Sequence, residues 1–252
     1  MKVELISFTP DALTLLLKTK GTRLTQQEDP AAWSEEKRQE HLEYMRDTIK
    51  SSWEFLDYVF RIDGVTRAFT HQLVRTRTGS YAQQAMRVVD AREQPVECSP
   101  SIAKSAQLSD LWDGAVDVVM RAYGELLDAG APAQDARGIL PTHITTSIMA
   151  KFNLRTLHEM AKVRLCTRTQ GEYQNVFREM RRLVIERHPW AAEFIEVHCV
   201  ATGTCCFPRY GKAECPVYLP EMDNTFVREA ARTKFWAVRH EAAPVAKDGK
   251  SQ

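Results

Sequence analysis

The sequence predicts a single domain of the α+β class, and three observations support this. Segments with the period-two alternation of strands lie between segments with the 3.6-residue period of helices. The two kinds do not alternate regularly, as they would in a doubly wound parallel sheet. No repeat, low-complexity tract or linker divides the 252 residues, of which 44% are hydrophobic and 27% charged. A chain of this size and composition can bury one core.

The first quarter of the chain contains two strands and two helices. Residues 2–8 and 55–63 alternate apolar and polar side chains and are rich in aromatic and β-branched residues, which favours strands. A short helix over 10–21 has Pro10 near its start and Gly21 past its end. A longer helix over 29–52 has Asp29 as its cap and Pro30 in its first turn.

The next segment combines a helix with an extended stretch. Val65, Phe69 and Leu73 lie at i, i+4 and i+8, which predicts a helix over 65–75 that buries one stripe. Gly79 interrupts this pattern. Residues 80–90 are predicted to be extended, and period two then places Gln83 and Arg87 on the same face.

The second half of the chain is mainly helical. The clearest helix covers 108–128, where an apolar stripe ends at Gly130 and Pro132. A β-rich stretch over 140–153 precedes helices over 154–165 and 172–189. A cysteine-containing loop and a helix near 221–238 follow, within about residues 196–240, and residues 241–252 are expected to be a frayed tail. We predict one catalytic domain over 1–252.

The overall charge and the absent motifs exclude several classes of protein. A formal net charge of +1 provides no general basic field for nucleic acid. No segment has the length and hydrophobicity of a membrane span, and the N-terminus lacks the pattern of a signal peptide, so we expect a cytoplasmic protein. Glycine-rich dinucleotide and Walker A loops are also missing. Any phosphorylated ligand must therefore be held by side chains.

Arginines are concentrated in a segment that contains no acidic residue. Residues 70–87, THQLVRTRTGSYAQQAMR, include Arg75, Arg77 and Arg87 but no Asp or Glu. Two explanations are open: an ion-pair network with partners elsewhere, or a site for an anion. Arginine suits the second because its planar fork binds phosphate oxygens bidentately. Further candidates lie later in the chain: Arg137, Asn153, Arg155, Arg164 and Arg168.

These arginine segments, taken in order, resemble the flavin-dependent thymidylate synthases. The central motif of that family is Arg-His-Arg, two residues, Ser, and a further Arg seven residues on. Here RTRTGSYAQQAMR supplies Arg75, Arg77, Ser80 and Arg87, with Gln72 just upstream. NLRTLHEMAKVRLCTRTQGEYQ matches the Asn-x-Arg helix of the family, and ARGILP matches its Arg before Leu-Pro. The resemblance covers about residues 50–195 and implies a mostly antiparallel central sheet with flanking helices.

The resemblance also implies a reaction and an assembly. The family methylates C5 of deoxyuridylate, with methylene-tetrahydrofolate as carbon donor and NADPH as reductant through FAD. The FAD is bound non-covalently across a homotetramer interface, without a Rossmann fold. Arg164 would be the catalytic residue, which meets the uracil edge and stabilises negative charge there. No metal is implied.

The remaining roles are carried over position by position. The nucleotide phosphate and base would be held by Gln72, Arg75, Gln83, Ala85, Met86, Arg87, Arg137 and Arg164. The flavin cofactor would be held by Arg75, Thr76, Arg77, Thr78, Asn153, Arg155, Glu159 and Arg168.

Several positions depart from the family pattern. The middle His of the triplet is Thr76, the usual Asn-Glu pair is Ala82-Gln83, and a phosphate-binding Ser is Ala85. Flavin-contacting His residues fall on Asp57 and near Arg168. These changes suggest a remodelled site. One branch of the family, associated with polyoxin-type nucleoside antibiotics, methylates UMP as well as dUMP, and a divergent motif is compatible with such a pocket.

Other interpretations stay open at this point. Flavin-dependent hydroxymethylation of a pyrimidine nucleotide would keep the same fold, and a non-catalytic nucleotide- or RNA-binding protein would use the arginines with Tyr81 for stacking. Cys166 could act as the nucleophile of an ordinary thymidylate synthase. Zinc is a further alternative, because one loop contains His198, Cys199, Cys205, Cys206 and Cys215, although no C-x₂-C pair is present.

Overall fold

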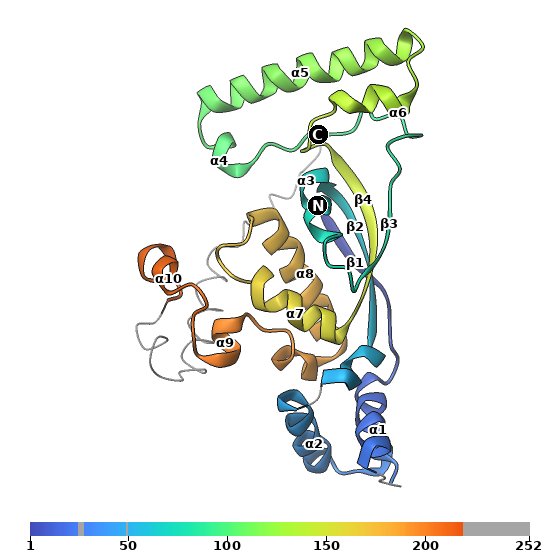
Figure 1. Cartoon of the computed structure of the whole chain (residues 1–252), viewed down its shortest axis with the longest axis vertical. Coiled ribbons are helices and arrows are strands. Elements are labelled where there is room, and N and C mark those ends of the chain that lie inside the picture. The colour runs from blue at the N-terminus through green and yellow to red at the C-terminus, as the bar shows by residue number, and fades with distance from the viewer. Residues whose placement is uncertain (25–27, 49, 219–252) are drawn as a thin grey trace, which may run out of the picture.

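The structure, a computed structural model, describes residues 1–24, 28–48 and 50–218. Its centre is a four-stranded sheet in the order β1-β2-β4-β3, in which every neighbouring pair is antiparallel. The strands are β1 (Lys2–Phe8), β2 (Asp57–Thr66), β4 (Thr145–Asn153) and β3 (Ser80–Gln83). The predicted α+β class, with an antiparallel sheet and flanking helices, is therefore confirmed (Figure 1).

One face of the sheet is covered by the helices that carry the predicted site. These are α3 (Arg67–Leu73), α7 (Leu154–Arg164) and α8 (Gly171–Arg187). Figure 1 shows α7 and α8 side by side against the sheet, with α9 (His198–Thr202) and α10 (Pro208–Glu214) farther out. The main core lies between this layer and the sheet and includes Tyr58, Phe60, Phe152 and Phe177, all fully buried. Burial of such side chains supplies most of the driving force for folding.

The N-terminal helices lie at one end of the sheet. Helix α1 (Ala12–Leu24) packs near α2 (Glu35–Asp47), and two short 3₁₀ helices, η1 (Pro30–Ala32) and η2 (Lys50–Phe55), flank α2. The predicted continuous helix over 29–52 is therefore wrong. Asp29 does cap η1, but the chain becomes extended at Trp33, and the Ser34 side chain starts a new helix by accepting from the Lys37 amide at 3.3 Å.

A second group of helices lies at the opposite end of the sheet (Figure 1). It comprises α4 (Pro100–Ala103), α5 (Ala106–Asp128), α6 (Ala133–Ala136) and η3 (Arg137–Ile139). The predicted helix over 108–128 is confirmed, but its apolar stripe is not buried by other parts of the chain that the structure describes. Tyr123 is the buried residue of α5, whereas Leu111 and Val118 are 67% and 56% exposed. A row of exposed apolar side chains on one helix is typical of a surface that contacts another molecule.

The predicted extended segment over 80–90 is only partly correct. Strand β3 ends at Gln83, and the chain then turns, with the Val88 amide donating to the Ala85 carbonyl at 3.1 Å. The turn occurs because Met86 enters a second apolar cluster, which also contains Tyr123 and Ala136. Arg87 therefore does not share a strand face with Gln83.

The C-terminal predictions are tested only in part. The predicted cysteine loop contains two short helices, α9 and α10, and a last 3₁₀ helix, η4 (Pro189–Glu193), follows α8. The helix predicted near 221–238 and the tail over 241–252 lie outside the described residues. Among the helices of the described part, none is both long and apolar enough to cross a bilayer.

Candidate functional site

A tight turn after α3 presents the central arginine motif. Tyr81, on β3, reaches back to this turn, and its hydroxyl donates to the carbonyls of Leu73 and Thr76 at 3.0 and 2.7 Å. Burial raises the pKa of Tyr81 to about 12, so the phenol stays protonated and can donate. The Tyr81 ring packs edge-on against Phe152 of β4. The turn with Arg75 and Arg77 is therefore fixed to the sheet.

Gly79 is required where this turn meets β3. A Cβ at this position would lie 2.5 Å from a ring carbon of Phe152 and 2.6 Å from the Tyr81 hydroxyl oxygen. Both groups are held by the sheet and by the turn, so neither can move away without loss of contacts.

We expect Gly79→Ala to destabilise the protein and to displace the arginine turn. Overpacking at a rigid site costs on the order of 1 kcal/mol or more. Chemical denaturation should therefore show a lower free energy of unfolding. The matched control is Gly124→Ala on α5, away from the exposed stripe, where the nearest atom to a Cβ would be Arg92 Cδ at 4.0 Å. Because alanine is the better helix former, Gly124→Ala should be neutral or stabilising. Equal losses in the two variants would contradict this account.

Three arginines of the predicted site have no carboxylate partners within the described residues. Arg75, Arg77 and Arg87 are exposed, and none of them forms a salt bridge with any residue in ranges 1–24, 28–48 and 50–218. The ordinary surface arginine Arg182 differs, because it pairs with both Glu179 and Glu186. Of the two explanations that the sequence left open, the absence of partners favours an anion site over an internal ion-pair network.

Two further arginines are held by aromatic rings rather than by acids. The Arg164 guanidinium lies 4.3 Å from the ring centre of Tyr173, and that of Arg168 lies 4.1 Å from the ring centre of Phe207. Tyr210 also lies near Arg168, at 5.4 Å. A cation–π contact uses the flat face of the guanidinium and leaves its N–H donors free. Arg164, the last residue of α7, and Arg168, in the turn that follows it, thus keep their donors available to an anion.

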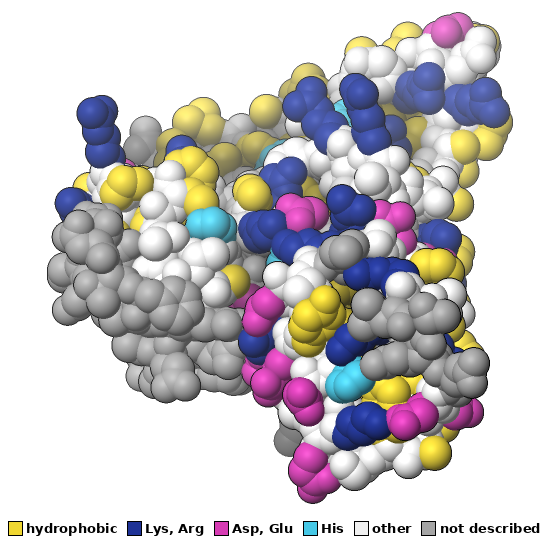
Figure 2. Space-filling model, turned by 60° about the horizontal axis from the view of Figure 1, so that its bottom comes forward, with side chains coloured by type: hydrophobic (Ala, Val, Ile, Leu, Met, Phe, Trp, Pro, Cys, Tyr) yellow, Lys and Arg dark blue, Asp and Glu magenta, His cyan; other side chains and the backbone are white. Residues whose placement is uncertain are grey.

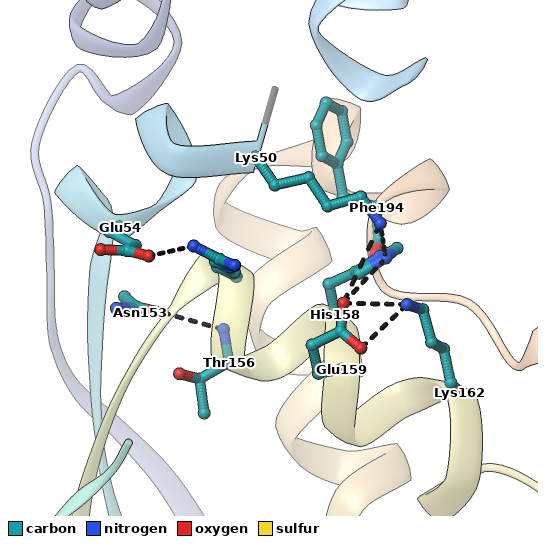
Figure 3. A network of polar contacts seen from close by, with 9 residues as sticks. Lys50, Glu54, Asn153, Thr156, His158, Glu159, Lys162 and Phe194 are labelled. Carbon is teal, nitrogen blue, oxygen red and sulfur yellow. Dashed lines mark hydrogen bonds and ion pairs between the residues drawn. The ribbon is translucent and has the colours of Figure 1, made fainter. Parts of the chain in front are cut away.

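The N-terminus of α7 carries the Asn-x-Arg part of the motif (Figure 3). Asn153 caps this helix, since its Oδ1 accepts from the Thr156 amide at 2.8 Å. Arg155 forms a salt bridge with Glu54. The Thr156 hydroxyl donates to that of Thr78 at 3.0 Å, which joins α7 to the arginine turn. Of the predicted flavin contacts, Thr78, Asn153 and Arg155 therefore lie in one region.

Glu159, a further predicted flavin contact, belongs to a mixed-charge network on α7. It pairs with Lys162 at 2.8 Å and lies 3.9 Å from Lys50 (Figure 3). Lys50 in turn contacts Nε2 of His158 at 2.8 Å. Because Glu159 already has cationic partners, it adds little repulsion toward an anionic ligand beside Arg155.

The predicted nucleotide contacts occupy α3, β3 and the segments after them. Gln72 donates to Gln170 at 2.6 Å, and Gln83 donates to the Thr70 hydroxyl at 2.8 Å. Met86 is buried in the second apolar cluster, so only its backbone is left for a ligand. Ala136 belongs to the same cluster, which brings the neighbouring positions Arg87 and Arg137 to one region. Ala85, which the sequence also predicts to contact the nucleotide, is exposed beside Met86.

The sequence prediction missed two residues near these groups. Arg67, at the start of α3, is half-buried; burial lowers its pKa, and Arg137 repels it in the same direction. It belongs to the acid-free stretch, which extends from residue 64 to 89, so that stretch could have revealed it. Tyr173 lies under Arg164, and its position in the first turn of α8 gives no comparable sign in the sequence.

Asp57, a departure from the family pattern, and two of the cysteines have contacts that are common in folded proteins. Asp57 is half-exposed and pairs with Lys151 at 3.1 Å. Burial raises the pKa of Cys199 to about 12, so this thiol stays neutral. Cys166, considered above as a nucleophile, packs against the main core. In the described part of the chain, no three His, Cys, Asp or Glu side chains are grouped so that they could hold a metal ion.

Side chains of both charges are mixed on the face of the molecule that Figure 2 presents. Figure 2 shows many Lys and Arg side chains in the middle of the face that it presents, with Asp and Glu side chains among several of them. This mixture agrees with the net charge of +1. The candidate anion site is therefore a local feature, made by arginines that form no salt bridge with any residue in the described part of the chain.

Together, the antiparallel sheet, a turn whose two arginines have no acidic partner in the described residues, and the arginines held on aromatic rings define an α+β protein with a candidate site for anionic ligands. The chain belongs to the family of thymidylate synthase complementing proteins, whose model matches residues 4–190. This finding confirms the resemblance predicted from the motifs.

Curated relatives carry a more specific name. The chain is 31% identical over 234 residues to a flavin-dependent thymidylate synthase of Sulfolobus acidocaldarius, covering 89% of this chain and 86% of that protein. It is 34% identical to one of Pyrococcus abyssi, over 62% of this chain and 67% of the relative. It is 36% identical to one of Geobacter sulfurreducens, over 54% and 59% of the two chains.

The residues present fit a flavin dinucleotide. Its diphosphate needs several donors without competing carboxylates, which the turn over Arg75–Arg77 and the aromatic-held Arg168 provide. The helix start at α7 adds Asn153 and Arg155, although the side chains of both already have protein partners. The fit therefore rests mainly on Arg75, Arg77 and Arg168.

Proposed function

We propose that this protein is a flavin-dependent nucleotide C5-methyltransferase that methylates UMP, dUMP or both. FAD is the cofactor, methylene-tetrahydrofolate supplies the carbon, and NADPH is the reductant. The observation that carries this proposal is the set of arginines that have no acidic partners within the described residues, at the motif positions of the family.

The protein residues act by binding and by electrostatics. Arg75, Arg77 and Arg168 hold FAD, while Gln72, Arg87 and Arg137 hold the nucleotide phosphate. When bound and reduced, FAD supplies the hydride for the one-carbon unit. The donors of Arg164 are held in place by Tyr173 and meet a carbonyl of the uracil ring. There they stabilise the negative charge that develops when C5 becomes nucleophilic. No protein nucleophile is required.

The departures from the family motif support activity on UMP as well as dUMP, as in the polyoxin-type branch of antibiotic biosynthesis. Thr76 is smaller than the usual His, and Ala85 is smaller and less polar than the usual Ser. Gln83 carries no charge where Glu is usual, and its side-chain amide is directed to Thr70 in the described residues. These changes reduce bulk and charge beside the nucleotide, which favours a less selective pocket.

The exposed stripe of α5 supports self-association, and we propose a homotetramer. Leu108, Leu111, Val118 and Leu126 are 39% to 67% exposed along this helix. Covering such side chains with another copy would bury apolar surface and favour assembly. Assembly would also bring arginine segments of different copies together, so that the ligands are shared between subunits.

Tritium release tests the proposed reaction directly. C5-tritiated dUMP and UMP are incubated with the protein, FAD, NADPH and methylene-tetrahydrofolate, with omission of FAD as the control. We expect FAD-dependent release from both nucleotides. Release from neither would refute the proposed methylation, and release from dUMP alone would refute activity on UMP.

A further inference from the structure

The hydroxyl of Tyr173 is an unusual buried polar group. Tyr173 lies in the first turn of α8 and is fully buried. Its hydroxyl oxygen has no hydrogen-bond partner within the described residues that meets normal geometry. A buried, unsatisfied hydroxyl costs stability, so an explanation in terms of function is warranted. By contrast, the hydroxyls of Tyr58 and Tyr81 are bonded.

The surroundings of Tyr173 connect the two halves of the site. Its ring lies under Arg164, with the guanidinium 4.3 Å from the ring centre, and Phe69 of α3 packs edge-on at 5.0 Å. Burial raises the pKa of Tyr173, while Arg164 and then Thr76 act in the opposite direction, which places both side chains near its hydroxyl. Arg164 belongs to the nucleotide side of the site and Thr76 to the flavin side.

We propose that Tyr173 is a positioning residue that couples nucleotide binding to flavin binding. Its ring orients Arg164, and its hydroxyl forms a hydrogen bond with the Thr76 side chain when FAD binds against the arginine turn. This inference rests on the proposed function and extends it to a residue outside the predicted site.

The geometry supports this role for the hydroxyl. The Thr76 carbonyl is already held by Tyr81 at 2.7 Å, so the side chain of Thr76 is the group left for Tyr173. The Tyr173 hydroxyl has no partner in the described residues, so a rotation of the Thr76 side chain, with the backbone of the turn held in place, is enough to form the bond. Because Arg164 lies on the same ring, a turn fixed by FAD also fixes Arg164.

Tyr173→Phe tests the hydroxyl without a change in packing. Calorimetry measures the affinity for dUMP with and without FAD, and the ratio of the two dissociation constants gives the coupling. We expect the coupling to fall about three- to tenfold, the amount that one hydrogen bond supplies. The affinity for dUMP alone should not change. The thermal midpoint should stay the same or rise, because an unpaired buried hydroxyl is removed.

The matched control is Tyr58→Phe, which removes a hydroxyl bonded to His188 at 3.0 Å in the same buried core. It should lower stability and leave the coupling unchanged. Unchanged coupling in Tyr173→Phe, or a wild-type protein without any coupling, would overturn the proposal. A loss of stability together with an equal loss of affinity for dUMP and for FAD would overturn the proposal too, since that result indicates a purely structural role. A protein that shows the coupling but releases no tritium would refute only the proposed methylation.

Discussion

Arg164→Ala is expected to lower the rate of tritium release about 100-fold, because the transition state loses a charged donor at the uracil carbonyl. The structure supports this expectation. Arg164 is oriented by the buried ring of Tyr173, and no carboxylate within the described residues competes for its donors. The effect should lie mainly in kcat, since the arginine acts most strongly on charge that develops during the reaction. Steady-state kinetics with tritiated dUMP would measure it.

Two further variants make the test specific. Arg164→Lys keeps the charge but loses the planar fork, so we expect only partial recovery of the rate. Arg182→Ala, on the exposed side of α8, removes an arginine paired with Glu179 and Glu186 and should keep wild-type turnover. If Arg164→Ala bound nucleotide normally and kept full turnover, the catalytic role would be wrong.

The stability of the protein is expected to fall as the pH drops below about 6.5, and His158 should contribute to this fall. Burial lowers the pKa of His158 to about 4 in the folded protein; a hydrogen bond to the Phe194 carbonyl opposes this, and Lys50 and Lys162 add to it. The hydrogen bonds of the His158 ring explain why its pKa is lowered. With Nδ1 donating to Phe194 at 2.7 Å, Nε2 accepts from Lys50 at 2.8 Å, so a second proton would be placed against an ammonium group (Figure 3).

The sign of the pH dependence of stability follows from the pKa values of His158 in the unfolded and in the folded chain. The unfolded chain binds a proton at His158 near pH 6.5, whereas the folded chain does so only near pH 4. The unfolded state therefore gains protons first, and the contribution of His158 decreases by about 2 kcal/mol between pH 7 and pH 5. Urea denaturation at both pH values would measure it. In His158→Gln the decrease should be smaller by that amount, and an equal decrease in both proteins would contradict the assignment.

Sequence patterns predicted most of the fold because the core residues follow clear periods. The pairing of β2 with β4, in which Tyr58 faces Phe152, joins two segments that both show strand alternation. The break at Trp33 and Ser34 was missed because a capping serine inside a polar helical stretch looks like an ordinary helix residue. The turn after Gln83 was missed because local alternation continues there, while tertiary packing of Met86 decides the path of the chain.

Only part of the candidate site can be recognised from the sequence. An acid-free run of arginines can be recognised locally, which revealed Arg75, Arg77 and Arg87. The role of Tyr173 depends on the contact between α7 and α8, which the sequence does not show. The aromatic residues beside Arg168 lie about 40 residues farther along the chain, Phe207 just before α10 and Tyr210 within it.

Equilibrium binding of FAD tests the central claim most directly, namely that arginines without acidic partners hold the cofactor. Flavin fluorescence is titrated with the wild-type protein and with the Arg75→Ala/Arg77→Ala variant, at low and high salt. We expect saturable binding by the wild type that weakens as salt rises, because charge-assisted contacts are screened. The variant should bind at least tenfold more weakly and depend less on salt. Equal affinity of the two proteins, or binding that does not respond to salt, would contradict the claim.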